Sequence, residues 1–291
     1  MSKPRIQDDL YTYVNQEKLD QLVIPDDKPC AGGFQTLAED VEKIMIGEFE
    51  EMSASMVYPN EHLKRACNLF KLAKDADKKE KFGVKPALDN LAIIKELKSV
   101  EDFNSQYKSL MLQKISLPLK IMVDTDMKDT KKHCVYIQGP SVILPDASYY
   151  KPEMSAQKDM IMGIWINVAK AILSKSDLSL EEQTKYLEDT LAFDSILGGL
   201  VKTSEEWSEY INMYNPMNIN EVSGLVNTID FKTVLNNLFG FVPETIIVSE
   251  PRYFEKFSEV FNEDNFELYK HWAYVNGLID ACSLLTDYLH N

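Results

Sequence analysis

Four histidines are the side chains best suited to hold a catalytic metal ion, but their spacing forms no zinc-binding helix motif. The HExxH motif places two imidazoles one turn apart on a helix, with a glutamate between them that activates a metal-bound water. No histidine here is followed by glutamate, no two are four residues apart, and the inverted HxxEH order is absent too. His271, beside Trp272, is interpreted as a packed or surface residue. The sequence therefore predicts no such zinc site at His62, His133, His271 or His290.

Three acidic residues lie close together in one polar segment. Asp124, Asp126 and Asp129 resemble the carboxylates of a calcium-binding loop. However, Lys128 occupies a ligand position, and no glycine follows where an EF-hand loop needs its sharp turn. The sequence therefore favours a solvated hairpin turn, with a metal site as the alternative.

Two glycines, Gly32 and Gly33, precede a predicted helix whose N-terminus could hold an anion. No GxGxxG motif follows, and Glu39 and Asp40 add negative charge, so a flexible entry to the helix is favoured. The methionines between residues 154 and 162 are interpreted as core side chains. The spacing along the chain suggests no Ser-His-Asp or Cys-His set, although such a set could still form in space.

The composition narrows the class of protein. The chain has 291 residues, with 31 Lys and Arg against 46 Asp and Glu, so its net charge is −15. This balance argues against a nucleic-acid partner. No segment reaches the roughly 20 apolar residues of a membrane span, and no signal peptide is recognisable, so we expect no membrane partner and a cytoplasmic location. The cysteines form no CxxC pair, which favours free thiols at Cys30, Cys67, Cys134 and Cys282.

One β-hairpin is predicted between Lys120 and Ile137, where apolar and polar residues alternate on both sides of the polar turn Thr125–Lys132. A lone hairpin is only marginally stable in water, so it must pack against other elements. A further short strand is predicted at Thr245–Ser249, and a charged connection at Lys74–Lys81.

Most of the remaining chain has apolar residues at helical spacing. Helix N-termini are predicted at three pairs of residues, named below, that resemble a capping box. The last helix is predicted over 264–291. The sequence thus predicts a mainly α fold, a multi-helix bundle-like domain with one small β-hairpin. We expect an N-terminal arm over 1–35 and a single mostly helical domain over 36–291. The capping pairs are Thr36 with Glu39, Ser99 with Asp102, and Ser179 with Glu182.

Several short motifs occur in the order found in one protein family. After the predicted hairpin, the segment Tyr136–Tyr150 reads YIQGPSVILPDASYY. This Gly-containing break, the Leu-Pro-Asp turn and the Tyr-Tyr pair resemble the N-terminal half of the neprilysin-like zinc endopeptidases. Asn215-Pro216-Met217 and the run 186–192 resemble further family segments, and the resemblance extends from about Gln7 to the last residue. At Gln16 and Lys18 the chain departs from the Gly and Trp that are usual in the family.

This resemblance implies a bacterial chain of the oligoendopeptidase O type. In the family, the zinc helices lie C-terminal to the region that matches here. The resemblance therefore implies a truncated, non-catalytic portion that encloses a chamber for peptide substrates and is inactive by itself. Zinc is then expected only in a missing catalytic half. That half could be a separate partner chain. Whether this chain is an enzyme is left open. The alternatives are a stand-alone helical module that binds peptides or proteins, and an unrelated helical enzyme.

One substrate-binding residue follows from the resemblance. Phe34 matches an aromatic residue that, in the family, helps line the pocket for the residue just after the scissile bond. Cys30 and Ala38 stand where some members carry arginines that hold a substrate's C-terminal carboxylate, so this clamp is missing. The alternative interpretation is that Phe34 is a hydrophobic staple at the start of a helix.

Overall fold

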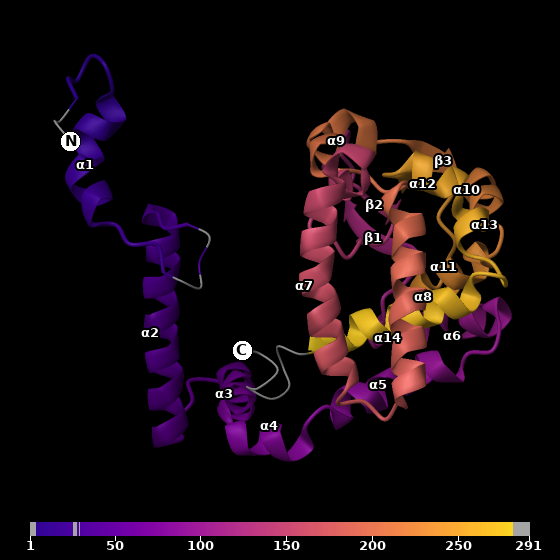
Figure 1. Cartoon of the computed structure of the whole chain (residues 1–291), viewed down its shortest axis with the longest axis horizontal. Helices are drawn as coiled ribbons and strands as arrows, with labels where there is room; N and C mark the ends of the chain where they lie inside the picture. The colour runs from indigo at the N-terminus through magenta and orange to yellow at the C-terminus, as the bar shows by residue number, and fades with distance from the viewer. Residues whose placement is uncertain (1–3, 26–27, 29, 282–291) are drawn as a thin grey trace. The chain divides into compact units, whose positions relative to one another are not determined.

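The computed structural model describes residues 4–25, 28 and 30–281 (Figure 1). The chain divides into two compact units, residues 1–75 and residues 76–291. Each unit is described by itself. The predicted boundary at residue 35 lies within the first unit and stays a prediction.

The first unit contains three helices, α1 (Leu10–Gln21), α2 (Gly33–Ser55) and α3 (Glu61–Lys74). Asn60 caps α3 by accepting a hydrogen bond from the Leu63 backbone. One side of α2 packs on α3, where the rings of Phe49 and Phe70 stack at 5.4 Å. No residue of α1 or α2, both fully described, is buried.

The predicted N-cap at Thr36 is wrong, because α2 begins at Gly33 with Gly32 as its cap residue. The Thr36 hydroxyl group instead donates a hydrogen bond to the Gly32 carbonyl at 3.0 Å, one turn back along the helix. A threonine inside a first turn can bond to the preceding turn in this way, so its type does not mark the helix start.

The second unit is mainly helical, as predicted, and its longest helices are α7 (Ser155–Leu173), α8 (Leu180–Gly198) and α14 (Phe266–Ala281). The segment predicted as a charged connection instead contains α4, so that prediction is wrong. The last predicted helix is confirmed to Ala281, and its remainder lies outside the described residues. The other helices are α4 (Ala76–Phe82), α5 (Lys85–Glu96), α6 (Val100–Leu112), α9 (Ser204–Ser208), α10 (Ile219–Leu225), α11 (Phe231–Phe239), α12 (Pro251–Glu255) and α13 (Phe257–Val260), with 3-10 turns η1 (Ala147–Tyr150), η2 (Pro152–Met154) and η3 (Tyr210–Met213).

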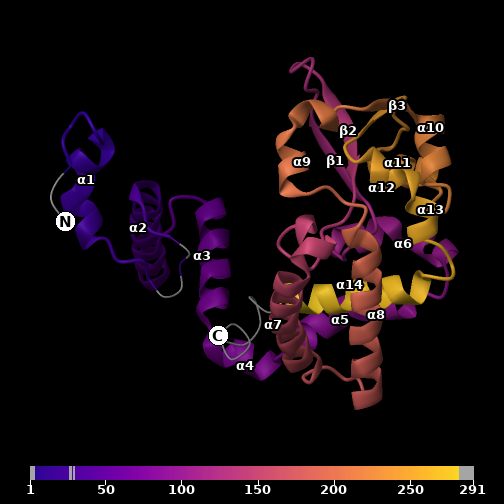
Figure 2. The ribbon, with the colours of Figure 1, turned by 45° about the horizontal axis from the view of Figure 1, so that its top comes forward.

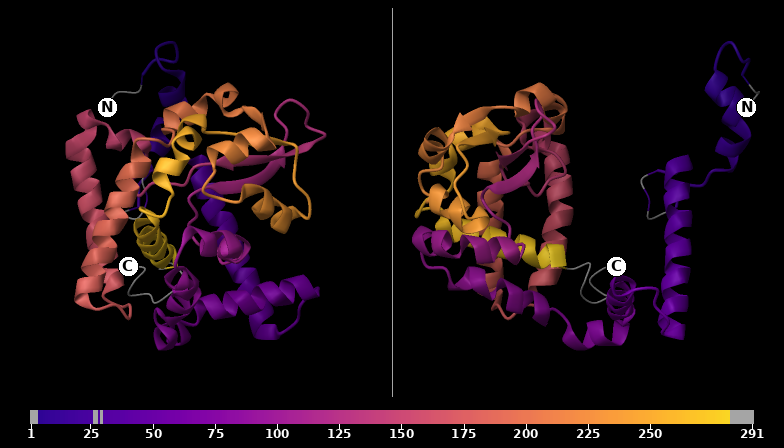
Figure 3. Two further views of the ribbon diagram at one scale, coloured as in Figure 1. Left: turned by 90° about the vertical axis from the view of Figure 1, so that its right-hand side faces the viewer. Right: turned by 180° about the vertical axis from the view of Figure 1, so that it is seen from behind.

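The sheet of the second unit has four strands in the order β1-β2-β4-β3. The predicted hairpin is confirmed as β1 (Lys120–Thr125) paired antiparallel with β2 (His133–Gln138), and its turn projects from the rest of the unit (Figure 3). The predicted strand is confirmed as β4 (Thr245–Val248), which pairs parallel with β2. The strand β3 (Pro216–Asn218) was not predicted, so the hairpin is part of a larger mixed sheet.

The core of the second unit lies where α14 crosses α8 and α5 (Figure 2). Aromatic side chains fill it, with Phe103, Phe261 and Tyr269 in mutual contact at centroid distances from 4.8 to 5.5 Å. The two pairs that Tyr269 forms are edge-to-face, and such aromatic contacts bury a large apolar area in a defined geometry.

Three buried tyrosines also fix the segment that leads into β1. The hydroxyl group of Tyr269 donates to the Ser116 carbonyl at 3.1 Å, and that of Tyr253 to the Pro118 carbonyl at 2.6 Å. Tyr107 reaches the Leu119 carbonyl at 3.3 Å. These bonds satisfy carbonyl groups of a connection at the core, which would otherwise be costly to bury. The helical core therefore sets where the sheet begins.

Candidate functional site

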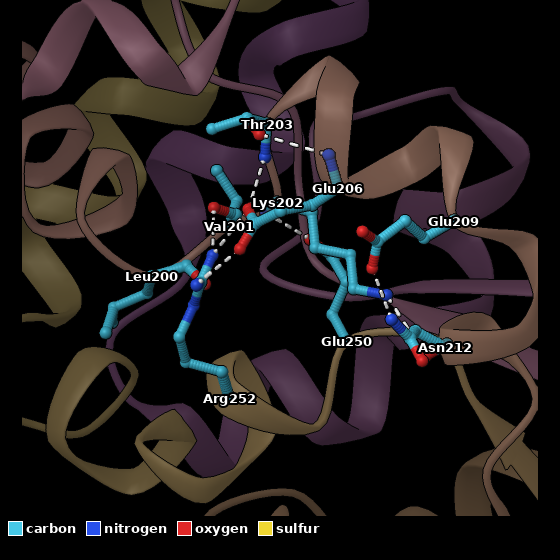
Figure 4. Close-up of polar contacts among 9 residues, drawn as sticks. All are labelled: Leu200, Val201, Lys202, Thr203, Glu206, Glu209, Asn212, Glu250 and Arg252. Atoms are coloured by element: carbon cyan, nitrogen blue, oxygen red, sulfur yellow. Dashed lines mark hydrogen bonds and ion pairs between the residues drawn. The ribbon is translucent and has the colours of Figure 1, made fainter.

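The loop after β2 is held by a buried carboxylate. Glu250, between β4 and α12, is only 2% exposed. One of its oxygens accepts a hydrogen bond from the Gly139 backbone at 2.6 Å. The other accepts from the Lys202 backbone at 2.8 Å (Figure 4). Burial raises the pKa of Glu250, although these bonds and the nearby lysine charges act against the rise. Glu250 thus joins three segments that are far apart in the sequence.

A second carboxylate holds the Leu-Pro-Asp turn of the same loop. Asp146 caps η1 by accepting from the Ser148 backbone at 2.8 Å, and it also accepts from the Ser204 backbone at 2.6 Å. Burial disfavours its ionised form, but the hydrogen bonds from Ser148 and Ser204 outweigh burial, so the pKa of Asp146 lies well below its usual range. The turn is therefore tied to the start of α9.

A third carboxylate fixes the end of the loop. Asp194, inside α8, accepts hydrogen bonds from the Tyr150 hydroxyl group and, at 2.8 Å, from the Ile143 backbone. Burial raises the pKa of Asp194 to about 6, although both hydrogen bonds favour the ionised form. Together, Glu250, Asp146 and Asp194 fix the segment whose motif resembles the neprilysin-like family.

The connection from α8 to α9 is fixed by an arginine. The guanidinium of Arg252 donates to the carbonyls of Leu200 and Val201 at 3.0 and 2.9 Å, and pairs with Glu206 at 2.8 and 3.0 Å (Figure 4). Glu206 also completes a capping box with Thr203 at the start of α9. The planar, five-donor guanidinium suits this set of acceptors.

The predicted substrate-binding residue, Phe34, lies at the second position of α2 and is 93% exposed. It does not pack as a hydrophobic staple. Leu37, Val41 and Ile44 follow it at helical spacing and are 60%, 47% and 65% exposed. We call these four residues the apolar row of α2. They lie on a different stripe from Phe49, which packs on α3.

Two of the other candidate metal ligands, His271 and Asp126, have partners within the protein. His271 is a packed residue, as predicted: its Nδ1 lies 2.6 Å from Asp189, and its ring stacks on Tyr186 at 3.7 Å. Asp126 accepts hydrogen bonds from the Lys128 backbone and the Tyr214 hydroxyl group, within the predicted hairpin turn. His290 lies outside the described residues.

Over residues 4–25, 28 and 30–281, no three His, Cys, Asp or Glu side chains are grouped so that they could bind a metal ion. Among those residues, too, no helix combines the length and the apolarity that crossing a membrane requires. Cys30, Cys67 and Cys134 are free thiols, and Cys282 lies outside the described part.

The sequence analysis did not identify three side chains that hold the loop after β2 and the connection from α8 to α9, namely Asp194, Glu250 and Arg252. For two of them the sequence contains a feature that could have indicated a buried carboxylate. Asp194 interrupts the apolar run LAFDSIL, and Glu250 ends the run TIIVSE. A carboxylate in apolar surroundings must find donors when it is buried, so such positions mark candidate anchors. No comparable signal marked Arg252.

Comparison with known proteins identifies the family. Residues 6–291 match the N-terminal model of Peptidase family M13, and the chain therefore belongs to this family. This confirms the resemblance to the neprilysin-like endopeptidases. The chain is 32% identical to the neutral endopeptidase of Lactococcus lactis subsp. cremoris, over 92% of this chain and 42% of that protein. It is 33% identical to the neutral endopeptidase of Lactobacillus helveticus, over 96% of this chain and 43% of the relative.

Solved structures agree with this result. The chain superimposes on PepO from Lactobacillus rhamnosis with a TM-score of 0.86 and 26% identity, covering 99% of this chain and 45% of that one. The Mycobacterium tuberculosis zinc metalloprotease Zmp1 shares the fold, with a TM-score of 0.85 at 22% identity, over 100% of this chain and 44% of Zmp1. The chain thus spans less than half the length of these proteins.

Proposed function

We propose that this chain is the helical portion of an M13 peptidase that encloses a chamber for peptide substrates, and that it does not hydrolyse peptides by itself. The apolar row of α2 carries the proposal. Isolated exposed apolar residues are common, but a continuous row along one helix is typical of an interaction surface. A module adapted to function alone would have a polar face there, so the row favours a portion of a larger peptidase over a stand-alone binding module.

The names of the relatives support a peptide as substrate, because two are called neutral endopeptidases and one solved structure is called a zinc metalloprotease. The described residues do not fit a zinc site, since no group of suitable ligands comes together. Zinc would act in a catalytic portion that carries an HExxH helix. The sequence of 291 residues lacks this motif, and a separate chain could supply it. The free thiols support a reducing, cytoplasmic location in a bacterium.

Within this proposal, Phe34 contacts the substrate. Burying one phenylalanine side chain contributes about 1.5 kcal/mol, so its loss is expected to weaken peptide binding by about tenfold. The neighbouring Leu37, one turn further along the row, would extend the same apolar surface.

The experiment combines a peptidase assay with a binding measurement on the purified chain. With added zinc and a quenched fluorescent decapeptide, we expect no hydrolysis that a chelator abolishes. Fluorescence anisotropy with a labelled peptide should show binding that Phe34→Ala weakens by about tenfold. Ile211→Ala is the matched control, because Ile211 is 90% exposed but lies in the second unit. Chelator-sensitive turnover by pure protein, or equal peptide affinity of the two variants, would contradict the proposal.

A further inference from the structure

A pocket of about 330 Å³ lies in the second unit beside the loop after β2. Its wall includes two lysines, two carboxylates and one tryptophan, together with backbone of the loop. The polar and aromatic side chains that matter here are Lys120, Lys202, Glu250, Asp146, Ser141 and Trp207. None of them belongs to the apolar row of α2.

The two lysines of this pocket have only uncharged hydrogen-bond acceptors. The ammonium group of Lys120 donates to the Ser141 hydroxyl group at 2.8 Å. That of Lys202 donates to the Asn212 carbonyl at 3.2 Å and lies 5.2 Å from the centre of the Trp207 ring. Within the described part of the chain, neither forms an ion pair with a carboxylate. Since an ammonium group has three donors, each lysine keeps donors for a ligand.

Some other lysines of this acidic chain form ion pairs with carboxylates. Lys185 lies 3.0 Å from the Asp189 carboxylate, and Lys256 lies 2.8 Å from the carboxylate of Glu259. Lys108 and Lys232 resemble the two pocket lysines in donating to uncharged acceptors. What distinguishes Lys120 and Lys202 is that both line one pocket, in a chain with 46 acidic residues.

The charge of Glu250 favours the charged form of both lysines. Burial lowers the pKa of Lys120 and of Lys202, and the negative charge of Glu250 acts against this effect on both. The Glu250 oxygens themselves are occupied by the backbone groups of Gly139 and Lys202. The carboxylate thus attracts the ammonium groups electrostatically while their donors remain free for another acceptor.

We propose that Lys120 and Lys202 hold a carboxylate group in this pocket. Charge-assisted hydrogen bonds from two ammonium groups suit a carboxylate. Glu250 and Asp146 line the same wall, so a ligand with one negative charge is better tolerated than the doubly charged phosphate. A peptide can supply this carboxylate from an acidic side chain or from its C-terminus. The site needs neither α2 nor a catalytic portion, so it does not depend on the proposed function.

The test uses the full chain, labelled with ¹⁵N, and follows the indole N–H signals during titration. N-acetylglutamate α-amide offers a side-chain carboxylate, N-acetylglutamine offers a terminal carboxylate, and N-acetylglutamine amide is the neutral match. We expect at least one acid to shift the Trp207 signal with an affinity at least tenfold above that of the neutral amide. Which acid binds more tightly identifies the source of the carboxylate. Equal affinity of all three, or tighter binding of inorganic phosphate, would overturn the proposal.

Variants test the two lysines directly. Lys202→Met should weaken binding of the preferred acid at least fivefold, and Lys120→Met should do the same. Because Lys120 is the more buried of the two lysines, Lys120→Gln serves as a second variant if the methionine variant does not fold. Lys256→Met is the control, since Lys256 is a lysine of the same unit outside the pocket. Unchanged affinity in a folded Lys202→Met protein would overturn the assignment.

Discussion

The hydroxyl group of Tyr150 donates a hydrogen bond to the carboxylate of Asp194, and this bond joins the loop after β2 to the C-terminal part of α8. Tyr150→Phe removes the donor and leaves Asp194 with the Ile143 backbone as a partner. Because a buried carboxylate then loses a hydrogen bond, we expect the free energy of unfolding to fall by about 1–3 kcal/mol. Urea denaturation measures this change. Tyr149→Phe is the control, since no hydrogen bond of the Tyr149 side chain is found in the described part of the chain. Equal stability of the two variants would contradict the role of the bond.

Asp194 should also make stability depend on pH. Burial raises the pKa of Asp194 from 3.8 to about 6 in the folded state. The folded state therefore holds the proton more tightly than the unfolded chain, so the wild type loses stability as pH rises from about 4 to about 6. Asp194→Asn does not titrate. The stability of the wild type relative to this variant should thus fall by about 2 kcal/mol between pH 4 and pH 7.

The measurement is urea denaturation of both proteins at pH 4, 5, 6 and 7. Other carboxylates affect both proteins alike, so they cancel in the difference. A difference in free energy that stays constant over this range would show that Asp194 titrates alike in the folded and unfolded states.

Gly198 lies so close to the Tyr150 ring that adding a methyl group at this position should lower the stability of the protein. A Cβ atom added at Gly198 would overlap the base of the Tyr150 ring, which Asp194 holds in place. At Gly199, the next residue, a Cβ atom would meet nothing within 4 Å. We expect Gly198→Ala to lower the free energy of unfolding by about 1–3 kcal/mol. Gly199→Ala should leave it unchanged or raise it slightly. Thermal melts of both variants decide, and equal melting temperatures would count against the packing described here.

Local features of the fold could be predicted from the sequence. The capping pairs Ser99–Asp102 and Ser179–Glu182 are confirmed, because a cap depends on residues three positions apart. The hairpin β1–β2 is confirmed for the same reason, since its alternation and its turn are contiguous. Where a local cue had two outcomes, as with the hydroxyl group of Thr36, the prediction failed.

Long-range features could not be predicted in this way. The parallel pairing of β2 with β4 joins strands about a hundred residues apart, and no pattern in either strand names its partner. Likewise, the contact of Glu250 with Gly139 spans 111 residues. The apolar residues before Glu250 could have indicated that its carboxylate is buried and hydrogen-bonded. They could not have indicated which backbone groups it binds. The role of Phe34 depends on what covers α2, so it stays a prediction.

Arg252 offers a test of whether charge or shape holds the α8–α9 connection. Its guanidinium serves the carbonyls of Leu200 and Val201 and both oxygens of Glu206 at once. Lysine keeps the charge but cannot reach all these acceptors from one nitrogen atom. We therefore expect Arg252→Lys to lower the free energy of unfolding by about 1 kcal/mol, through the lost carbonyl bonds.

The ion pair with Glu206 is half exposed and should contribute little, so 1 M salt should not change this difference. Lys256→Ala, which removes only an exposed pair with Glu259, should have almost no effect. If Arg252→Lys proved as stable as the wild type in chemical denaturation, charge alone would be sufficient to hold the connection.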